Sequence, residues 1–232
     1  AHYCDEKKFD DLVDEEKYDE SFKYYFDVIL KPFSKCMLKA LDKIRDLDIE
    51  VICNGHGPVL RSNWKKYVEL SRQWSEEYLG HPEKQRVFIP YVSAYDKTGQ
   101  LAEKIAEGVR ASGDIEAVPM DIEMASIGDL ESEVTQATGI IVGSPTINQN
   151  ILLPVYKLFG VMTPLRDKNK LAGGFGSYGW SGEGASLIKN ALTSLKMKYF
   201  EDGVFVKFTP DKEELEKGFN YGKAFGKKLI ED

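Results

Sequence analysis

The sequence RVFIPYVSAYDKTGQLA, residues 86–102, joins a short apolar run to a polar loop and the start of a helical pattern. The run from Val87 to Val92 has the length of a buried strand and is too short for most helices. After the loop, apolar residues return at helical spacing, at Leu101, Ile105 and Val109. The stretch therefore predicts a buried strand, a hydroxyl-rich loop and a helix.

The loop between strand and helix, Ser93 to Thr98, has the features of an anion site. A helix that starts where a parallel strand ends offers unpaired backbone N–H groups and the positive end of its dipole. The glycine patterns of the P-loop and of the dinucleotide-binding fingerprint are both missing from this loop. The loop predicts a phosphate site built from backbone and hydroxyl donors, and it also fits an ordinary loop whose Ser and Thr cap the helix.

Strand and helix patterns alternate through the rest of residues 84–232. Further apolar runs predict strands at Ile115 to Val118, Gly139 to Gly143, Leu171 to Gly176 and Gly203 to Phe208. Five strands separated by helices require a parallel sheet covered on both faces, which is a doubly wound α/β domain. In the strand order 2-1-3-4-5, the loops after the first, third and fourth strands meet at the switch point where ligands bind.

Composition excludes several classes of protein. The chain has 232 residues, 42% of them apolar, and a formal net charge of −7. Neither half has the basic excess that nucleic-acid binding needs, and no apolar run approaches the roughly 20 residues of a membrane span. The cysteines are odd in number and widely spaced, so they predict neither a disulfide framework nor a zinc site. We expect a cytoplasmic protein with no nucleic-acid or membrane partner.

Residues 1–83 differ from the alternating region that follows. Apolar residues at helical spacing predict helices on both sides of Pro32 and a third helix over residues 63–79. A short linker is predicted at residues 81–85. The predicted helices carry more large apolar side chains than they can bury among themselves, so we expect another surface to cover them. Those side chains are Phe22, Phe26, Ile29, Phe33, Met37 and Leu41.

A β-like run from Ile49 to Cys53 ends in the sequence Asn54-Gly55-His56-Gly57-Pro58. Glycine on either side of His56 permits a tight turn, so the imidazole is placed to reach a site at the edge of a sheet. The same pattern also fits an exposed turn. No second cluster of metal-ligating residues accompanies this histidine in the sequence.

Two loops of the second region carry specific motifs. The sequences Gly143-Ser144-Pro145-Thr146-Ile147-Asn148 and Gly176-Ser177-Tyr178-Gly179-Trp180-Ser181-Gly182-Glu183 resemble the second and third FMN loops of the flavodiiron proteins, also called A-type flavoproteins. Residues 93–98 are similar to the family's first loop but match it less closely. Ala1-His2-Tyr3-Cys4 resembles the segment just beyond the family's bridging aspartate, and residues 54–58 resemble its last iron-ligand loop.

The resemblance implies a flavodoxin-like, five-stranded parallel sheet of order 2-1-3-4-5 in residues 84–232. It also implies that residues 1–83 are the C-terminal part of a metallo-β-lactamase-like (αββα) domain. The family's remaining iron ligands would lie upstream of Ala1, so His56 is a metal ligand only if those ligands are present. We therefore expect no di-iron centre in this chain by itself.

The resemblance implies FMN as the cofactor and assigns residues to each part of it. The phosphate would be surrounded by Ser93, Tyr95, Asp96, Lys97 and Thr98. The ribityl chain and one ring edge would be lined by Ser144, Pro145, Thr146, Ile147 and Asn148. The other ring edge would be lined by Ser177, Tyr178, Gly179, Trp180, Ser181 and Gly182. One of Tyr95, Tyr178 and Trp180 would stack on the isoalloxazine, or these aromatic residues pack within their loops.

The function implied is FMN-dependent electron transfer, as the flavodoxin-like part of an oxygen or nitric oxide reductase. Such a chain is an oxidoreductase when a di-iron half is supplied and an electron carrier without it. Its electron donor would be a rubredoxin-like protein or an NAD(P)H-dependent reductase, and its front region would be covered in a homodimer or by an upstream fragment. The alternative is a stand-alone flavodoxin-like carrier with a vestigial, metal-free front segment.

Two other classes fit the residues less well. A metallo-β-lactamase-type hydrolase needs the ligand cluster that the sequence lacks, and a receiver-type module needs an acidic pocket that Val92-Ser93-Ala94 does not supply.

Overall fold

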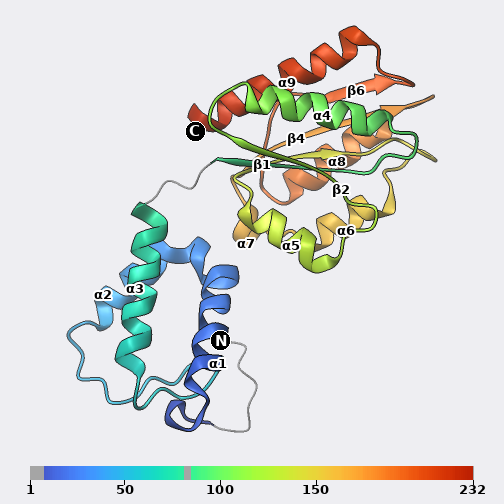
Figure 1. Ribbon diagram of the computed structural model, residues 1–232. Helices are drawn as coiled ribbons and strands as arrows, with labels where there is room; N and C mark the ends of the chain where they lie inside the picture. The colour runs from blue at the N-terminus through green and yellow to red at the C-terminus, as the bar shows by residue number, and fades with distance from the viewer. Residues whose placement is uncertain (1–7, 81–84, 232) are drawn as a thin grey trace. The chain divides into compact units, whose positions relative to one another are not determined.

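The computed structural model describes residues 8–80 and 85–231 and divides the chain into two compact units, Ala1–Glu83 and Lys84–Asp232 (Figure 1). The segment resembling the family's bridging-aspartate region and most of the predicted linker lie outside the described residues. Among the residues described, no helix combines the length and the apolar character needed to cross a membrane.

The first unit contains α1 (Glu15–Tyr25), α2 (Ser34–Ile44) and α3 (Trp64–Gly80). The two helices predicted on either side of Pro32 are present, but the chain does not leave the helical conformation between them. A π-helical turn (Phe26–Leu30) and a 3-10 turn (Lys31–Phe33) connect α1 to α2. In π and 3-10 turns the backbone N–H groups bond to different carbonyls from those they reach in an α-helix. A proline, which has no N–H to donate, is therefore accommodated without ending the helical path.

The strand predicted at residues 49–53 is not formed. Only one antiparallel bridge joins Ile52 to Leu60, with N–H···O distances of 2.8 and 2.9 Å in the two directions. An isolated pair of short strands is marginally stable in water, and the described part of this unit contains no sheet that the segment joins.

The core of the first unit is small. Tyr18, Leu60 and Tyr67 are buried together, whereas Ile29 and Phe33 remain 41% and 38% exposed. The expectation of uncovered apolar side chains therefore holds for part of the predicted set, while Phe26 and Leu41 are buried.

The buried Asp10 fixes the entry to α3. Its carboxylate accepts the backbone N–H groups of Arg61, Ser62 and Asn63 at 2.6 to 3.2 Å. Burial opposes ionisation of Asp10, but these backbone donors together hold its pKa below the ordinary value. The carboxylate thus fixes, from a distant part of the chain, the backbone segment that leads into α3.

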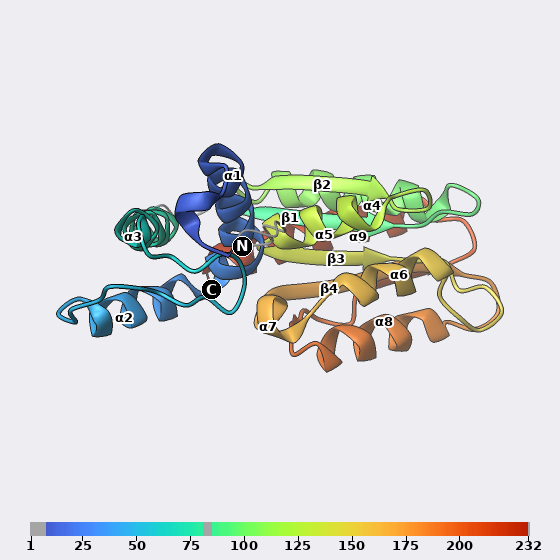
Figure 2. The same cartoon turned by 90° about the horizontal axis from the view of Figure 1, so that it is seen from below.

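The second unit is built on one parallel sheet (Figure 2). Its strands are β1 (Arg86–Tyr91), β2 (Glu116–Asp121), β3 (Gly139–Gly143), β4 (Leu171–Tyr178), β5 (Lys198–Tyr199) and β6 (Val204–Lys207). The order β2-β1-β3-β4-β5 confirms the predicted one. The last predicted strand corresponds to β6, and the two-residue strand β5, which was not predicted, pairs with an earlier part of β4.

Helices cover both faces of this sheet (Figures 1 and 2). One face carries α4 (Lys97–Arg110) and α9 (Lys212–Glu231). The other carries α5 (Ile127–Gln136), α6 (Leu153–Val161), α7 (Pro164–Asp167) and α8 (Glu183–Ser194). Because each face has its own apolar core, the central strands β1, β3 and β4 are buried on both sides, as their continuous apolar sequences predict.

Glycines allow α4 and α9 to approach backbone to backbone. A Cβ added at Gly108 would lie 1.9 Å from the carbonyl oxygen of Phe219, and one at Gly222 would lie 2.1 Å from that of Ile105. Neither neighbour is a flexible side chain, so any larger residue must push the helices apart. This close contact holds α4, and the loop that precedes it, against the sheet.

Replacing Gly108 with Ala should lower the free energy of unfolding by about 1–3 kcal/mol, because the added methyl group overpacks the contact between α4 and α9. Gly160→Ala in α6 is the matched control, since no atom lies within 4 Å of the Cβ it would add. Urea unfolding followed by circular dichroism measures both variants. Equal stability of the two proteins would contradict the close contact.

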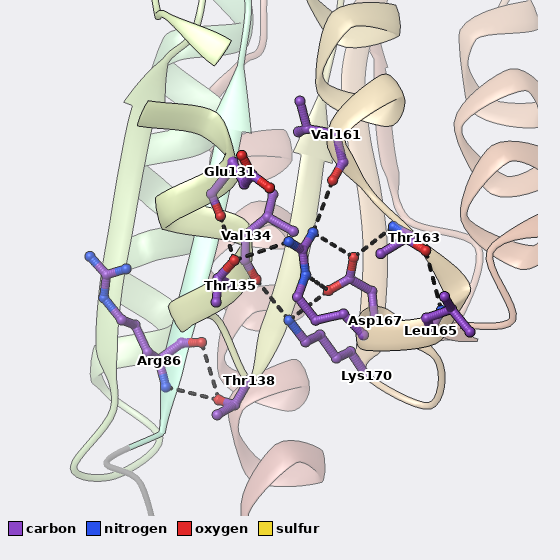
Figure 3. Close-up of polar contacts among 11 residues, drawn as sticks. Arg86, Glu131, Val134, Thr135, Thr138, Val161, Thr163, Leu165, Asp167 and Lys170 are labelled. Carbon is purple, nitrogen blue, oxygen red and sulfur yellow. Dashed lines mark hydrogen bonds and ion pairs between the residues drawn. The ribbon is translucent and has the colours of Figure 1, made fainter. Parts of the chain in front are cut away.

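A second stabilising feature is the buried carboxylate of Asp167, just before β4 (Figure 3). Arg166 donates to it twice at 2.9 Å, and Lys170 and the backbone N–H of Thr163 each donate once at 2.9 Å. Arg166 and Lys170 also reach carbonyl oxygens, of Val161 and of Val134 in α5, so the cluster joins α5 and the end of α6 to the start of β4. Burial opposes ionisation, but these cationic and N–H donors hold the pKa of Asp167 below its ordinary value.

Asp167→Ala should destabilise the protein by about 3–5 kcal/mol, because it removes the buried carboxylate that balances the largely buried cations of Arg166 and Lys170. Asp202→Ala is the control, since Asp202 is 97% exposed in its ion pair with Lys189 and should contribute little. A lowered folded-state pKa stabilises the ionised form, so this contribution is complete above the ordinary pKa of 3.8 and is lost as the pH falls through the folded-state value. Unfolding titrations at pH 7 and near pH 3 should show the difference between the two variants shrinking in acid.

Candidate functional site

A cavity of about 310 Å³ opens among the loops that follow β1, β3, β4 and β6. Because the strands are parallel, these loops all leave the carboxyl edge of the sheet. The predicted residues on the cavity wall are Tyr95, Lys97, Thr98, Pro145, Thr146, Ile147, Ser177, Tyr178, Gly179 and Trp180. The predicted convergence of three loops on one crevice is therefore present in the structure, and its volume falls within the range of about 300–1,000 Å³ usual for ligand sites.

The loop after β1 presents a row of backbone donors. In the part of the chain that the structure describes, the amide N–H groups of residues 94–98 have no hydrogen-bond partner. The loop ends in Asp96, whose left-handed backbone (φ 58°) turns the chain into α4. The buried Thr98 hydroxyl lies 3.3 Å from that of Ser177. Unpaired amides at a helix N-terminus with a hydroxyl beside them form a suitable site for an anion.

Two predicted residues of this loop do not line the cavity. The Ser93 hydroxyl accepts the backbone N–H of Gly99 at 3.2 Å and so holds the first turn of α4. The Asp96 carboxylate accepts a hydrogen bond from Gln100 at 3.3 Å and lines a neighbouring cavity. Both residues shape the loop rather than the wall.

The loop after β3 is fixed from within. Ser144 is fully buried, donates to the carbonyl oxygen of Pro145 at 2.9 Å and accepts the N–H of Leu152 at 3.1 Å. A tight turn follows, closed by two backbone hydrogen bonds of 3.0 Å between Ile147 and Asn150. Asn148 lies exposed in this turn with φ 53° and does not line the cavity. These bonds hold Pro145, Thr146 and Ile147 on the wall.

The loop after β4 supplies the most exposed aromatic ring. Trp180 is 93% exposed, and Tyr95 in the first loop is 82% exposed. Thr146 accepts the backbone N–H of Gly184 at 3.2 Å and thereby ties the second loop to the third. Ser181 and Gly182 precede α8 and do not line the cavity.

Sequence reasoning missed Ala94, Phe208 and Thr209, which also line the cavity. Phe208 and Thr209 follow β6, and the ring centroid of Phe208 lies 6.3 Å from that of Trp180. The fifth predicted strand ended at Phe208, so its carboxyl end was a signal that a fourth loop reaches the same edge. That loop carried no recognisable motif.

The chemistry of the wall is that of a binding site. Among the described lining residues, Lys97 carries the formal charge, and aromatic rings and backbone amides make up much of the remainder. No carboxylate or histidine of the described part lines it. The arrangement suits a molecule with an anionic end and a flat aromatic end.

His56 lies in the first unit, in the turn between Ile52 and Leu60. Asn54 donates to the carbonyl oxygen of Pro58 at 3.0 Å and closes that turn. The imidazole lies 6.2 Å from the ring of Tyr25 and lines a separate apolar cavity of about 310 Å³. Among the described residues, no group of three or more His, Cys, Asp or Glu side chains is arranged to hold a metal ion.

Comparison with known proteins gives concordant similarities. Residues 89–222, more than half of the chain, match the family model described as Flavodoxin. A type A flavoprotein of Rhodobacter capsulatus is 37% identical over 100% of this chain and 52% of its own length. A flavo-diiron protein of Clostridium acetobutylicum is 34% identical over 99% of this chain and 58% of its own length.

Solved structures agree with the sequence similarities. Rubredoxin oxygen:oxidoreductase from Desulfovibrio gigas superposes with a TM-score of 0.73 at 27% identity, over 98% of this chain and 57% of that one. The flavodiiron protein from Giardia intestinalis gives 0.69 at 26% identity, over 99% and 56%. The chain thus spans about half the length of these relatives.

Proposed function

The chain belongs to the flavodoxin family and is related over its length to the type A flavoproteins, as its motifs predict, and from this premise we propose that residues 84–232 hold FMN in the cavity at the carboxyl edge of the sheet. The family and the named relatives support FMN-dependent electron transfer as the function. The observation that carries the proposal is the row of unpaired amides at residues 94–98 on the same cavity as exposed aromatic rings.

The residues present fit the two ends of FMN. A dianionic phosphate needs several donors and positive potential, which the unpaired amides, the start of α4, Thr98 and Lys97 together supply. A planar, largely apolar ring needs aromatic and apolar contacts, which Tyr95 and Trp180 supply. When bound, FMN would supply reversible electron transfer, and the protein's share is to bind it, orient it and set its surroundings.

The remaining residues take supporting roles in this proposal. Pro145, Thr146 and Ile147 would border the ribityl chain and one ring edge, while residues 177–180 would border the other. Ser93 and Ser144 act through the backbone bonds that shape their loops. Asn148, Ser181 and Gly182 contribute through loop conformation, since they lie off the wall.

The proposed reaction and electron donors are those of a longer protein of which this chain would form a part. We propose that this chain is the flavin-binding part of an oxidoreductase that passes electrons to a di-iron centre and reduces oxygen or nitric oxide. A rubredoxin-like protein or an NAD(P)H-dependent reductase would supply the electrons. The di-iron centre, the oxygen substrate and the rubredoxin donor are suggested by the names of relatives about twice as long as this chain, whereas nitric oxide and the NAD(P)H-dependent reductase follow from the resemblance of the loop motifs.

Residues 1–83 take a structural part in the same proposal. Exposed Ile29 and Phe33, together with the apolar cavity beside His56, are the surfaces that a second copy or an upstream polypeptide would cover. We assign this unit to the C-terminal part of a metallo-β-lactamase-like domain, in which His56 becomes a ligand once further iron ligands are supplied.

The direct test is flavin binding by the purified chain. Apoprotein prepared by acid precipitation and refolding should bind added FMN in a one-to-one complex, detected by quenching of flavin fluorescence. Riboflavin should bind more weakly, because it lacks the phosphate that the loop after β1 is built to hold. A colourless protein that takes up neither flavin would refute the proposal.

Replacing Ser93 and Thr98 together with Ala should weaken FMN binding and leave riboflavin binding nearly unchanged. The loss should be about 10-fold, because the Thr98 hydroxyl would no longer donate to the phosphate and such a bond to a charged group contributes about 1.5–3 kcal/mol. The Ser93 change adds to it by removing the bond to Gly99 that holds the first turn of α4. Thr193→Ala is the control, since that exposed hydroxyl bonds only to carbonyls of its own helix, α8. If the double variant keeps the preference for FMN over riboflavin, the phosphate binds elsewhere.

A further inference from the structure

Phe208, directly after β6, has an unusual backbone. Its φ of 61° lies in the left-handed region, where a bulky aromatic residue is an outlier. Its N–H donates to the carbonyl oxygen of Tyr178 at 2.7 Å, so the end of β4 holds this conformation in place. Strained residues of this kind cluster at ligand sites, where the surrounding structure offsets their cost.

The strained backbone places the ring at the cavity and not in the core. Val206, two residues earlier, is buried under the sheet, whereas Phe208 is 59% exposed and lines the cavity. A residue that continued the extended strand would place its side chain on the same face as Val206, because alternate residues of a strand share a face. The left-handed turn therefore redirects the ring toward the carboxyl edge.

At that edge, Phe208 contacts Trp180 edge to face. The ring centroids are 6.3 Å apart and the interplanar angle is 73°, a favourable geometry for an aromatic pair. The indole is 93% exposed, and within the described residues its aromatic contact is with Phe208. The Phe208 ring also lies against Gly179, where a Cβ would meet it at 3.4 Å.

We propose that Phe208 is a positioning residue of the flavin site, which holds Trp180 at the cavity mouth in the orientation that meets the flat ring of FMN. This inference rests on the proposed function. Without Phe208, the indole would have to be ordered when the ring binds, and this ordering would weaken binding. The left-handed conformation is then retained for the site, although it costs stability.

Phe208→Asn separates a role at the site from a purely structural one. Asn tolerates the left-handed backbone and lacks the ring, so the thermal midpoint should stay unchanged or rise. The Kd for FMN should rise about two- to tenfold, which corresponds to the usual strength of an aromatic pair. The fluorescence of Trp180 is obtained as the difference between proteins with and without Trp180→Phe. In the Phe208→Asn apoprotein its anisotropy should fall, because the indole moves more freely.

Lys196→Asn is the matched control. Lys196 also has a left-handed backbone, with φ 59°, but it follows the far end of α8, the helix that begins beside the cavity. Asn should reduce the strain of the left-handed backbone at this position as it does at position 208. It should leave both the Kd for FMN and the Trp180 anisotropy unchanged.

The outcomes distinguish the inference from the proposed function. If the wild-type chain binds no FMN, both are refuted. If the wild type binds FMN and Phe208→Asn binds it equally tightly, or leaves the Trp180 anisotropy unchanged, only the role of Phe208 is refuted. A fall in stability without a change in Kd would assign Phe208 to the fold alone.

Discussion

The parallel alignment of β1, β3 and β4 is the constraint on which the rest of the second unit depends. Parallel strands need a crossover of a dozen or more residues, which the helices on the two faces provide. The same alignment places every loop that follows a strand at one edge. Residues from the loops after β1, β3, β4 and β6, far apart in sequence, therefore line a single cavity.

The two edges of this sheet have different roles. The polar cluster of Arg166, Asp167 and Lys170 lies just before β4 and is fully paired, so it stabilises the packing of α5 and α6 (Figure 3). The carboxyl edge instead keeps unpaired amides and exposed rings, with the strained Phe208 beside them. Groups that would be costly in a core are tolerated there, because a ligand and solvent complete their interactions.

The front unit shows how far local sequence pattern predicts structure when the described residues of the unit contain no sheet. Its helices formed where apolar spacing predicted them, since an amphipathic helix satisfies its own backbone bonds. The strand at residues 49–53 did not form, because a strand needs a neighbour for its N–H and C=O groups. The π and 3-10 turns around Pro32 could not be predicted from the sequence either, because such short turns produce no distinct periodicity of apolar residues.

The sequence by itself determined the alternation of strands and helices and two loop motifs, because these depend on local periodicity and short-range chemistry. The strand order followed from the resemblance that the loop motifs carry. Gly139–Gly143 was predicted to the residue, because its apolar run is short and is bounded by polar residues on both sides. Only the tertiary structure decided which loop residues face the cavity. Ser93, Asp96 and Ser144 were predicted site residues, yet their side chains form hydrogen bonds within or next to their own loops. Phe208 lines the cavity although no sequence motif predicted it. Side-chain direction in a loop is set by backbone angles and by contacts between distant segments, and neither is encoded in residue spacing.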